Sequence, residues 1–484
     1  MKKLFELLEN TTVGALYGDG SAAIAGLTYD SRVVKPGDCF FAVPGTQSDG
    51  HDYIPSAVAK GAAAVVCERM PETAAEGVAY VVVEDSAGAM ADMAAAFYDY
   101  PSRELKLVGI TGTNGKTTTV TLLYDLVRAL GYKAGLVSTV VYKIDGREIE
   151  ATHTTPDPIR LNAMMREMAD AGCEFCFMEC SSHAIVQERT RGLDFAGGIF
   201  SNITHDHLDY HKTFAEYIRA KKLFFDGLPK GAFALTNADD RNGRVMVQNT
   251  AAAVSTYSLR AMADFRCKIV EMHLDGMLLR IDGQELWVGL LGRFNAYNLL
   301  AVYGAAVLLG LDRSEVLRVL SVLHAVSGRF EKVRAANGTT AIVDYAHTPD
   351  ALENVIQTIG EIRTPGQQLI VVCGCGGDRD RTKRPEMAQI AVKYASTAIF
   401  TSDNPRHESP EAILDDMVAG LDPGVRYLRI ADRAEAIRTA VMLSRPGDIL
   451  LIAGKGHETY QIVGDVKHHF DDREEVRKSF ELLN

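Results

Sequence analysis

The chain has 484 residues, of which 24% are charged and 47% hydrophobic, with a formal net charge of −12 at pH 7. This length is too great for one compact core, and about 150 residues per domain predicts about three domains. The acidic balance argues against a broad nucleic-acid surface or an anionic membrane partner, and the absence of a signal-peptide pattern and of an apolar run of ~20 residues predicts a cytoplasmic protein.

Short apolar runs alternate with alanine-rich stretches over the first hundred residues. The runs predict strands at 39–43, 63–67 and 80–83, and the pattern ends in Asp-Tyr-Pro-Ser at 99–102. Alternation of this kind is typical of a small α/β domain, which we assign to residues 1–102.

A glycine-rich segment follows, reading Gly-Ile-Thr-Gly-Thr-Asn-Gly-Lys-Thr-Thr-Thr over 109–119. Gly112 and Gly115 allow backbone N–H groups to face an anion, Lys116 supplies a positive charge, and Thr117 offers a hydroxyl to Mg²⁺. The strict P-loop pattern requires a glycine five residues before Gly115, where this chain has isoleucine, so only a shorter variant matches. An ordinary glycine turn is the alternative, but the pattern favours a nucleoside triphosphate site.

Alternating strands and helices continue to the C-terminus. Such alternation implies a parallel sheet whose ligands bind at the carboxyl ends of the strands. Strands rich in Val, Ile and Leu and followed by Gly or Asp are typical of a doubly wound fold. We therefore expect an α/β protein with a central P-loop-type parallel-sheet ATPase domain, 103–328, and a C-terminal Rossmann-like domain, 329–484. The expected strands are 134–138, 175–179, 198–202, 341–344, 369–373, 398–401 and 449–453.

The eight cysteines are too few for a disulfide framework in a chain of this length. Two close pairs, Cys173 with Cys176 and Cys373 with Cys375, raise the possibility of zinc. No second pair stands at zinc-ribbon distance from the first, which lies in an apolar run. We therefore expect buried structural thiols.

Metal-capable side chains follow two strands of the central block. Glu179 ends the strand 175–179, where it can bind Mg²⁺ or form a loop salt bridge. The segment 205–211 after the next strand contains three histidines and two aspartates. Zinc is possible by ligand type, but hard oxygen ligands beside bound phosphates favour Mg²⁺.

Seven motifs occur in one order along the chain: Gly-Thr-Asn-Gly-Lys-Thr at 112–117, Glu-Cys-Ser-Ser-His at 179–183, Asp-His-Leu-Asp-Tyr-His at 206–211, Ala-Lys at 220–221, Asn-Ala-Asp-Asp at 237–240, Gly-Arg-Phe-Asn-Ala-Tyr-Asn at 292–298 and Asp-Tyr-Ala-His-Thr-Pro-Asp at 344–350. Together they resemble the Mur ligases, and the resemblance covers nearly the whole chain. It implies a three-domain cytoplasmic amide ligase that builds the peptide stem of cell-wall precursors. It also implies the reaction, in which ATP phosphorylates a carboxylate of a UDP-linked substrate and an amine then attacks the acyl phosphate.

The resemblance also implies the residues that handle ATP and metal. Lys221 lies in 218–225, whose periodicity alone predicts an amphipathic helix with solvated lysines, but it matches the family lysine that CO₂ carbamylates to N6-carboxylysine. Strand-end capping is the alternative role for Asp344 and His347. The implied catalytic residues are Lys116, Glu179, His207 and Lys221, and the implied Mg²⁺ ligands are Thr117, Glu179, His207 and Lys221. The implied ATP-binding residues are Gly112, Thr113, Asn114, Gly115, Lys116, Thr117, Thr118, Asn295, Asn298, Arg329, Asp344 and His347.

Other segments match the family's binding regions for the UDP-linked dipeptide. These are 28–32 and 49–54 in the N-terminal block and 154–157 and 187–189 in the central block. The implied contacts are Ser31, His51, Thr154, Thr155, Ser181, Gln187 and Arg189.

Asp-Asn-Pro-Arg at 403–406 resembles the family's mark of meso-diaminopimelate addition, and lysine-adding relatives lack this arginine. Diaminopimelate differs from lysine by a distal carboxylate, which a guanidinium can bind with two hydrogen bonds. Many relatives have an aspartate before the next proline, where this chain continues His-Glu-Ser-Pro at 407–410. The implied diaminopimelate contacts are Arg379, Asp403, Asn404, Arg406, Gly454 and Glu458.

The resemblance thus predicts a monomer with Mg²⁺ as cofactor and ATP, UDP-N-acetylmuramoyl-dipeptide and meso-diaminopimelate as substrates, without a nucleic-acid or membrane partner. A lysine-adding ligase, a D-alanyl-D-alanine-adding ligase and a folylpolyglutamate synthase are alternatives within the fold. Outside the ligases, a nucleotide-switch ATPase would leave Arg379, Arg406 and Glu458 without a role.

Overall fold

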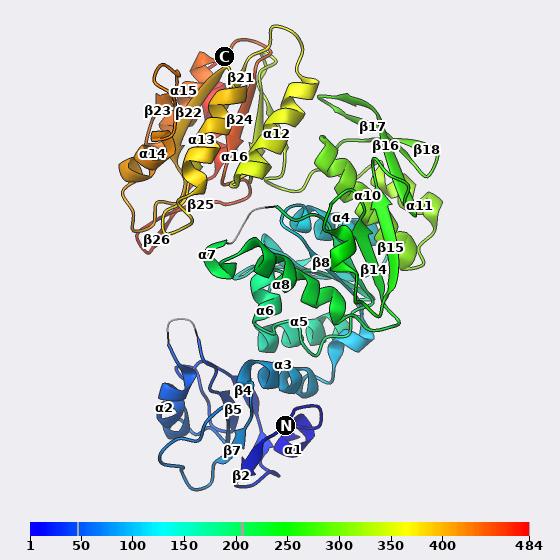
Figure 1. Ribbon diagram of the computed structural model, residues 1–484, viewed down its shortest axis with the longest axis vertical. Coiled ribbons are helices and arrows are strands. Elements are labelled where there is room, and N and C mark those ends of the chain that lie inside the picture. The colour runs from blue at the N-terminus through cyan, green and yellow to red at the C-terminus, as the bar shows by residue number, and fades with distance from the viewer. Residues whose placement is uncertain (46–47, 205–207, 484) are drawn as a thin grey trace.

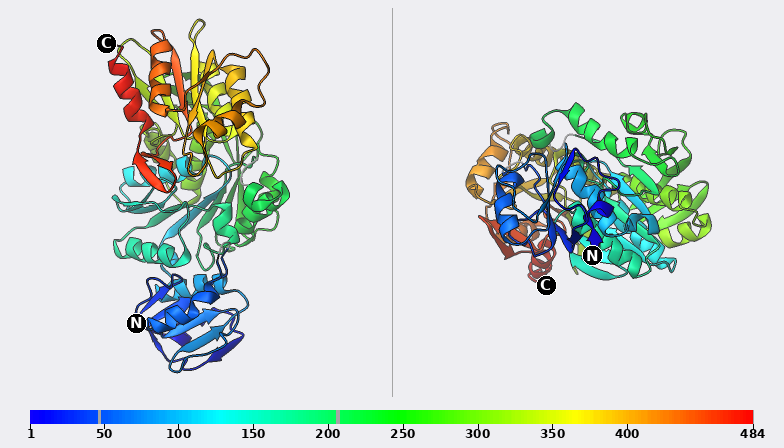
Figure 2. Two further views of the ribbon diagram at one scale, coloured as in Figure 1. Left: turned by 90° about the vertical axis from the view of Figure 1, so that its left-hand side faces the viewer. Right: turned by 90° about the horizontal axis from the view of Figure 1, so that it is seen from below.

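A computed structural model describes residues 1–45, 48–204 and 208–483. It is an α/β protein in which each of three domains has its own main sheet. Figure 1 shows the N-terminal domain in blue at the bottom, the central domain in the middle and the C-terminal domain, yellow to red, at the top. The side view in Figure 2 shows the same order, with the N-terminal domain distant from the C-terminal domain. We propose domain boundaries near residues 102 and 328.

The N-terminal domain contains a five-stranded sheet in the order β2-β7-β6-β5-β4. Its strands from β4 to β7 are parallel, and β2 is antiparallel to β7. The three predicted strands are present as β5, β6 and β7. The domain's elements are β1 (Lys2–Lys3), α1 (Leu4–Leu7), β2 (Ala15–Tyr17), β3 (Ala23–Ile24), β4 (Gly26–Thr28), β5 (Asp38–Phe41), η1 (Gly50–Tyr53), α2 (Ile54–Ala59), β6 (Ala64–Cys67), β7 (Ala79–Val82), α3 (Ser86–Phe97) and η2 (Pro101–Glu104).

The central domain is built on an eleven-stranded sheet in the order β11-β10-β9-β12-β8-β13-β14-β15-β16-β17-β18. The strands from β9 to β16 in this order are parallel, as the sequence predicts. The strands are β8 (Lys106–Thr111), β9 (Ala134–Val137), β10 (Val141–Ile144), β11 (Arg147–Glu150), β12 (Phe175–Glu179), β13 (Gly197–Phe200), β14 (Phe233–Asn237), β15 (Ala253–Ser258), β16 (Phe265–His273), β17 (Gly276–Ile281) and β18 (Gln284–Val288).

Both edges of this sheet carry antiparallel strands, which the expectation of a parallel sheet did not include. Two-residue Asp-Gly turns at 145–146 and 282–283 join β10 to β11 and β17 to β18. Both residues of each turn have positive φ, at 45° and 91° in the first and 46° and 88° in the second. Such turns match the twist of paired antiparallel strands.

Helices on both faces bury the central strands. α4 and α10 pack against each other, while α6 packs against α8. α8 begins at the N-cap Thr213, whose hydroxyl accepts the N–H of Glu216, and it contains the predicted helical stretch 218–225. The helices are α4 (Lys116–Ala129), α5 (Pro158–Asp170), α6 (Ser182–Val186), α7 (Leu208–His211), α8 (Phe214–Asp226), α9 (Gly243–Met246), α10 (Arg293–Leu308) and α11 (Arg313–Leu320).

The C-terminal domain has a six-stranded sheet in the order β19-β20-β24-β21-β22-β23, parallel except for the edge strand β19. Its four predicted strands are β20, β21, β22 and β24. The elements are β19 (Glu331–Arg334), β20 (Thr340–Asp344), α12 (Pro349–Ile362), β21 (Leu369–Cys375), α13 (Lys383–Tyr394), β22 (Thr397–Ser402), α14 (Pro410–Val418), β23 (Leu428–Arg429), α15 (Arg433–Leu443), β24 (Ile449–Ala453), β25 (Tyr460–Val463), β26 (Val466–His469) and α16 (Asp472–Glu481).

All eight cysteines lie in the described part of the chain and are buried free thiols, as the sequence predicts. Among the described residues, no helix has the length and apolar character needed to cross a membrane.

A buried ion pair joins two helices and two strand ends of the C-terminal domain. Arg433 on α15 donates two hydrogen bonds of 2.7 Å to the carboxylate of Asp472 on α16. Its remaining donors reach the backbone oxygens of Ser402 at 3.3 Å and Ala453 at 3.0 Å. Because both charged side chains are fully buried, removing one leaves the other charge without compensation.

Arg433→Ala is therefore expected to lower the free energy of unfolding of the C-terminal domain by about 3–5 kcal/mol. Urea unfolding of purified variants measures this change. Arg438→Ala, which removes an exposed ion pair with Glu435 on the same helix, serves as the control and should change it by less than about 0.5 kcal/mol. Equal effects of the two substitutions would contradict the assignment.

Candidate active site

The glycine-rich segment forms the turn between β8 and α4, at the carboxyl edge of the central sheet. β8 ends at Thr111, and α4 begins directly after Gly115. Gly115 has a φ of 88°, and a Cβ atom there would lie 2.4 Å from Oδ1 of Asn298. Because a glycine-rich turn at a helix N-terminus directs backbone N–H groups at an anion, this turn can hold a phosphate.

Lys116 lies across this phosphate loop. Its Nζ donates hydrogen bonds of 2.8 Å to the backbone oxygens of Gly112 and Thr113. Thr117 and Thr118 follow in the first turn of α4, and both are buried. The predicted phosphate-binding side chains therefore surround one helix N-terminus.

Two asparagines of α10 lie against the phosphate loop. Asn298 donates a 3.2 Å hydrogen bond to Oδ1 of Asn295, which itself donates to the backbone oxygen of Leu291 at 2.7 Å. Both amides are buried, and Asn298 packs beside Gly115. The structure thus places the two predicted ATP-binding asparagines next to the loop.

A carboxylate and an ammonium group are buried at the same edge of the sheet. Glu179 ends β12, and its two carboxylate oxygens accept the N–H of Thr139 at 2.8 Å and its hydroxyl at 3.2 Å. Lys221 on α8 donates a 2.8 Å hydrogen bond to the backbone oxygen of Gly112. Burial raises the pKa of the neighbouring Cys180 thiol, the charge of Glu179 raises it further, and the charge of Lys221 lowers it. The charges of Glu179 and Lys221 therefore both affect the pKa of the Cys180 thiol.

The donor set fits Mg²⁺ only in part. The Thr117 hydroxyl and the Glu179 carboxylate are the hard oxygen donors that Mg²⁺ prefers. The ammonium of Lys221 would repel the cation and fits only after addition of CO₂. His207 lies outside the described residues. Within 1–45, 48–204 and 208–483, no three His, Cys, Asp or Glu side chains gather as a metal-binding group.

The C-terminal domain reaches the phosphate loop through Arg329. Its guanidinium donates a 3.2 Å hydrogen bond to the Thr117 hydroxyl and lies 4.5 Å from the ring centroid of Tyr345. Asp344 accepts the N–H of Phe330 at 2.7 Å and so fixes the backbone next to Arg329. Burial raises the pKa of Asp344, whereas the charge of Arg329 lowers it.

A second contact joins the same two domains. Asp350, in the first turn of α12, accepts a 2.9 Å hydrogen bond from Asn114 in the phosphate loop and a 3.4 Å one from Thr204. Asp350 was not among the predicted residues, although it ends the Asp-Tyr-Ala-His-Thr-Pro-Asp motif. His347 in that motif has Nδ1 2.8 Å from the backbone oxygen of Tyr345.

A cavity of about 920 Å³ lies between the central and C-terminal domains. It brings together most of the predicted substrate residues. The central domain contributes Thr154, Thr155, Ser181, Gln187 and Arg189, and the C-terminal domain contributes His347, Arg379, Asp403, Asn404, Arg406, Gly454 and Glu458.

The central wall of the cavity is connected to Glu179. Arg189 donates 2.6 Å hydrogen bonds to the backbone oxygen of Thr155 and to Oε1 of Gln187. The Thr155 hydroxyl donates to the backbone oxygen of Glu179 at 2.6 Å. A ligand bound against Thr155 would therefore approach the strand end that carries Glu179.

The opposite wall holds two carboxylates around a buried lysine. Nζ of Lys455 lies 2.9 Å from Glu458 and 3.9 Å from Asp403, and it also donates to Oδ1 of Asn404 at 2.9 Å. Burial and the charge of Asp403 raise the pKa of Glu458, while Lys455 lowers it. The sequence prediction did not include Lys455, which lies three residues before the predicted Glu458.

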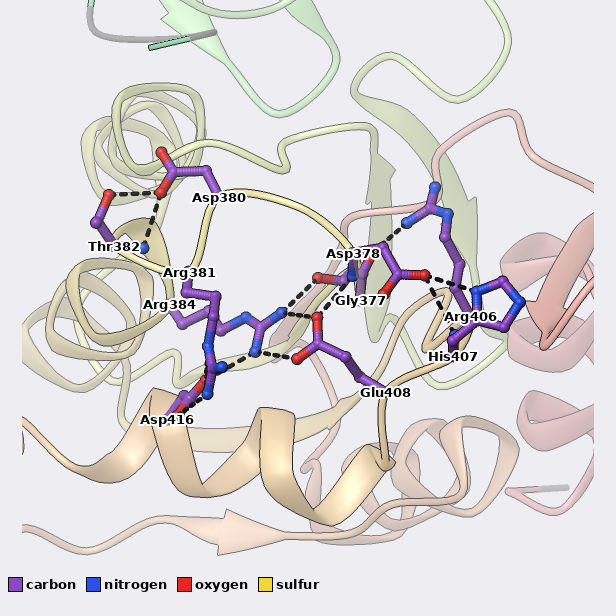
Figure 3. A network of polar contacts seen from close by, with 11 residues as sticks. Gly377, Asp378, Asp380, Arg381, Thr382, Arg384, Arg406, His407, Glu408 and Asp416 are labelled. Atoms are coloured by element: carbon purple, nitrogen blue, oxygen red, sulfur yellow. Dashed lines mark hydrogen bonds and ion pairs between the residues drawn. The ribbon is translucent and has the colours of Figure 1, made fainter. Parts of the chain in front are cut away.

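Arginines complete the charge pattern of this wall. Arg379 and Arg406 both line the cavity. Arg406 has a φ of 51° and donates a 2.8 Å hydrogen bond to the backbone oxygen of Gly377, as Figure 3 shows. Cationic and anionic groups on one wall suit a substrate that carries both charges, such as an amino acid.

Ser31 and His51 do not lie at this cavity. Lys60 donates a 2.8 Å hydrogen bond to the backbone oxygen of Ser31. Nδ1 of His51 lies 2.7 Å from Oδ1 of Asp49, and Nε2 accepts the N–H of Glu68 at 2.9 Å. Both ring nitrogens of His51 are thus bonded within the N-terminal domain.

Comparison with known proteins agrees with this architecture. Residues 23–98 match the model "Mur ligase family, catalytic domain", 110–306 match "Mur ligase middle domain", and 328–456 match "Mur ligase, glutamate ligase domain". A UDP-N-acetylmuramoyl-L-alanyl-D-glutamate--2,6-diaminopimelate ligase of Phocaeicola vulgatus is 55% identical over 480 residues, 99% of either chain. The chain belongs to the Mur ligase family.

Further relatives support the family assignment. The Bacteroides thetaiotaomicron protein with the same name is 54% identical over 479 residues, again 99% of either chain. A solved structure of a ligase with this name shares 33% identity with a TM-score of 0.71, covering 100% of this chain and 99% of the other. A MurF ligase of Thermotoga maritima in complex with ADP has a TM-score of 0.62 at 18% identity, covering 94% and 97%, and so shares the fold.

The phosphate loop gives a direct test on this Mur ligase. Gly115→Ala places a methyl group against Asn298 in addition to straining a positive φ, and overpacking of about 1–3 kcal/mol predicts a KM for ATP raised about 5- to 150-fold. The control is Gly131→Ala beyond the other end of α4, where φ is 92° but no atom lies within 4 Å. Steady-state ADP release measures both, and a similar KM in the two variants would contradict the role of the Gly115 contact.

Proposed function

We propose that this ligase joins meso-2,6-diaminopimelate to UDP-N-acetylmuramoyl-L-alanyl-D-glutamate, with conversion of ATP to ADP and phosphate, in the synthesis of peptidoglycan precursors. The observation that carries the proposal is the charge pattern of the cavity, where Arg379 and Arg406 accompany Asp403 and Glu458 on the wall facing Arg189. The relatives' names support it. The reaction belongs in the cytoplasm, where ATP and the soluble precursor are present, and a monomer contains every residue that it uses.

The residues divide the chemistry between two steps. The glutamate carboxylate of the dipeptide attacks the γ-phosphorus of ATP, the bond to the β-phosphate oxygen breaks, and ADP leaves. The phosphate loop, Lys116 and Arg329 stabilise the charge on the transferring phosphoryl group. The amine of diaminopimelate then attacks the acyl carbon, phosphate leaves, and the amine loses a proton. Activation is required because a carboxylate is a poor electrophile at neutral pH.

Mg²⁺ is part of the proposal. Thr117 and Glu179 would hold it, together with His207 and a carbamylated Lys221. The cation would neutralise the phosphate oxygens, which makes transfer between two anions feasible. Reaction of the neutral Lys221 amine with CO₂ forms an N–C bond and releases one proton. The carbamate that results offers an oxygen donor in place of an ammonium group that would repel the cation.

The dipeptide would lie along the central wall, with Arg189 facing an anionic group and with Thr154, Thr155, Ser181 and Gln187 beside it. The UDP end would extend to the N-terminal domain. Burial raises the pKa of Tyr29, which lies in the same N-terminal segment as Ser31, Asp157 of the central domain raises it further, and Arg189 lowers it. Because both ring nitrogens of His51 are already hydrogen-bonded within the N-terminal domain, we propose that His51 supports the backbone of the UDP site.

Diaminopimelate would place its distal carboxylate at Arg406 and its distal ammonium group near Asp403 and Glu458, while its other amine, in the neutral form, attacks the acyl phosphate. Lysine lacks the distal carboxylate and would leave the arginine unpaired, which a site built for a hydrogen-bonded group rejects strongly. A D-alanyl-D-alanine-adding enzyme would have no use for Arg406. The charge pattern therefore favours diaminopimelate over these alternatives.

The proposed amine specificity can be measured directly. ADP release with ATP, Mg²⁺ and UDP-N-acetylmuramoyl-L-alanyl-D-glutamate is expected to have a kcat/KM for meso-diaminopimelate at least about 100-fold above that for L-lysine. Arg406→Ala should reduce this ratio to below about tenfold while the KM for ATP stays unchanged. A kcat/KM for L-lysine equal to or above that for meso-diaminopimelate in the unsubstituted protein would overturn the specificity assignment.

Carbamylation of Lys221 makes a separate prediction. Lys221→Ala should lose at least about 100-fold in kcat, and added acetate or formate should restore part of the activity by supplying an oxygen donor. Lys222→Ala is the control, because that neighbouring lysine pairs with Asp226 and should retain activity within about twofold. A mass increase of one CO₂ on Lys221 in gently prepared protein provides an independent readout. Full activity of Lys221→Ala would contradict the proposal.

A further inference from the structure

Two loops of the C-terminal domain each carry one cavity-lining arginine. The first loop, 376–382, follows β21 and contains Arg379, while the second loop, 403–409, follows β22 and contains Arg406. The N–H of Gly377 donates to the backbone oxygen of Asn404 at 2.9 Å, and Arg406 donates to that of Gly377 at 2.8 Å. A Cβ atom at Gly377 would lie 1.9 Å from the oxygen of Pro405, so the two backbones touch directly.

Glu408 at the end of the second loop adds a charged link between the loops. Its Oε1 accepts the N–H of Asp378 in the first loop at 2.6 Å. Arg384 holds both carboxylate oxygens, with NH2 2.7 Å from Oε1 and NH1 2.9 Å from Oε2, as Figure 3 shows. This fork lowers the pKa of Glu408 to about 2. Glu408 therefore stays ionised and paired at neutral pH.

The position of Arg384 requires negatively charged partners, because a buried cation there would otherwise be uncompensated. Arg384 lies fully buried in the first turn of α13, where a cation opposes the helix dipole. Asp416 on α14 accepts a second hydrogen bond from NH1 at 2.7 Å, and NH2 also reaches the backbone oxygen of Gly376 at 3.2 Å. One guanidinium thus contacts the first loop, the second loop and the helix behind them.

We propose that Arg384 and Glu408 are positioning residues that fix the two loops against each other and thereby set the affinity for the amine substrate. Neither residue lines the cavity, so both act through Arg379 and Arg406. The identity of the amine as diaminopimelate rests on the proposed function.

Glu408→Gln should affect one substrate selectively, which a general role of Glu408 in fold stability would not produce. Glu408→Gln keeps the shape of the side chain but removes the charge of the fork. It is expected to raise the KM for meso-diaminopimelate at least about tenfold, with kcat within about threefold and the KM values for ATP and the UDP-dipeptide within about twofold. Loss of domain stability would instead change all of these parameters together.

Asp416→Asn is the control, because it weakens the contacts that Arg384 and Arg381 make with α14 without breaking a link between the two loops. Its KM for meso-diaminopimelate should stay within about threefold of that of the unsubstituted protein. Glu408→Asp, which keeps the charge but shortens the reach, should give an intermediate KM and serves where Glu408→Gln fails to fold. Equal KM values for Glu408→Gln and Asp416→Asn, or a parallel change in all three substrates, would overturn the inference.

Hydrogen exchange separates this inference from the proposed function. In Glu408→Gln, the backbone amides of 376–382 and 403–409 should exchange at least about tenfold faster, whereas those of 112–118 in the phosphate loop should not change. This measurement needs no substrate. If the unsubstituted protein showed no diaminopimelate-dependent ADP release, the proposed function would fail, and unchanged exchange in the two loops would by itself refute the positioning role.

Discussion

Parallel pairing in the central sheet is the constraint on which the active site depends. β8 pairs with β12 so that Ile110 lies opposite Glu179, and it pairs with β13 so that Ile110 also lies opposite Ile199. The phosphate loop begins two residues after Ile110, so the carboxylate of Glu179 emerges at the level of the loop. A register shift of one residue would turn Glu179 to the other face of the sheet. The register therefore sets which charge meets the phosphates.

Buried charges come next in importance, because each one must be compensated where it lies. Lys221 donates to a backbone oxygen of the phosphate loop, Lys455 lies between carboxylates, and Arg433 forms an ion pair with Asp472. Replacing such groups by apolar side chains is often neutral or stabilising, so stability alone does not explain them. In Lys221 and Lys455 the charge lies at the site itself. Arg433 instead donates hydrogen bonds to the ends of β22 and β24, and residues that line the cavity follow both strands.

The sequence predicts the parallel strands and the edge at which the site forms, because apolar runs followed by polar loops are local patterns. The antiparallel arms also had a local signal in the Asp-Gly pairs at 145–146 and 282–283, which the expectation of a parallel sheet obscured. Contacts between domains had no such signal. The hydrogen bond from Arg329 to Thr117 joins residues 212 positions apart, and it depends on how two folded domains dock. Lys455 and Arg384 were missed because each is a single basic residue whose role appears only in its partners.

Substrate choice in this cavity follows from rigidity as much as from charge. If the guanidinium lay on a mobile loop, its binding to a carboxylate would cost the conformational entropy of ordering that loop. This cost would weaken the discrimination between substrates that differ only by that carboxylate. Arg406 instead has a left-handed backbone conformation, held by hydrogen bonds from its N–H to Ile462 and from Gly464 to its oxygen, at 3.1 and 2.8 Å. The β25–β26 hairpin thus supports the second loop from one side while the first loop supports it from the other. Arg406 is already ordered before the amine binds. An amine without the distal carboxylate would therefore leave the guanidinium without a carboxylate partner, and this would weaken the binding of that amine by the full energetic penalty.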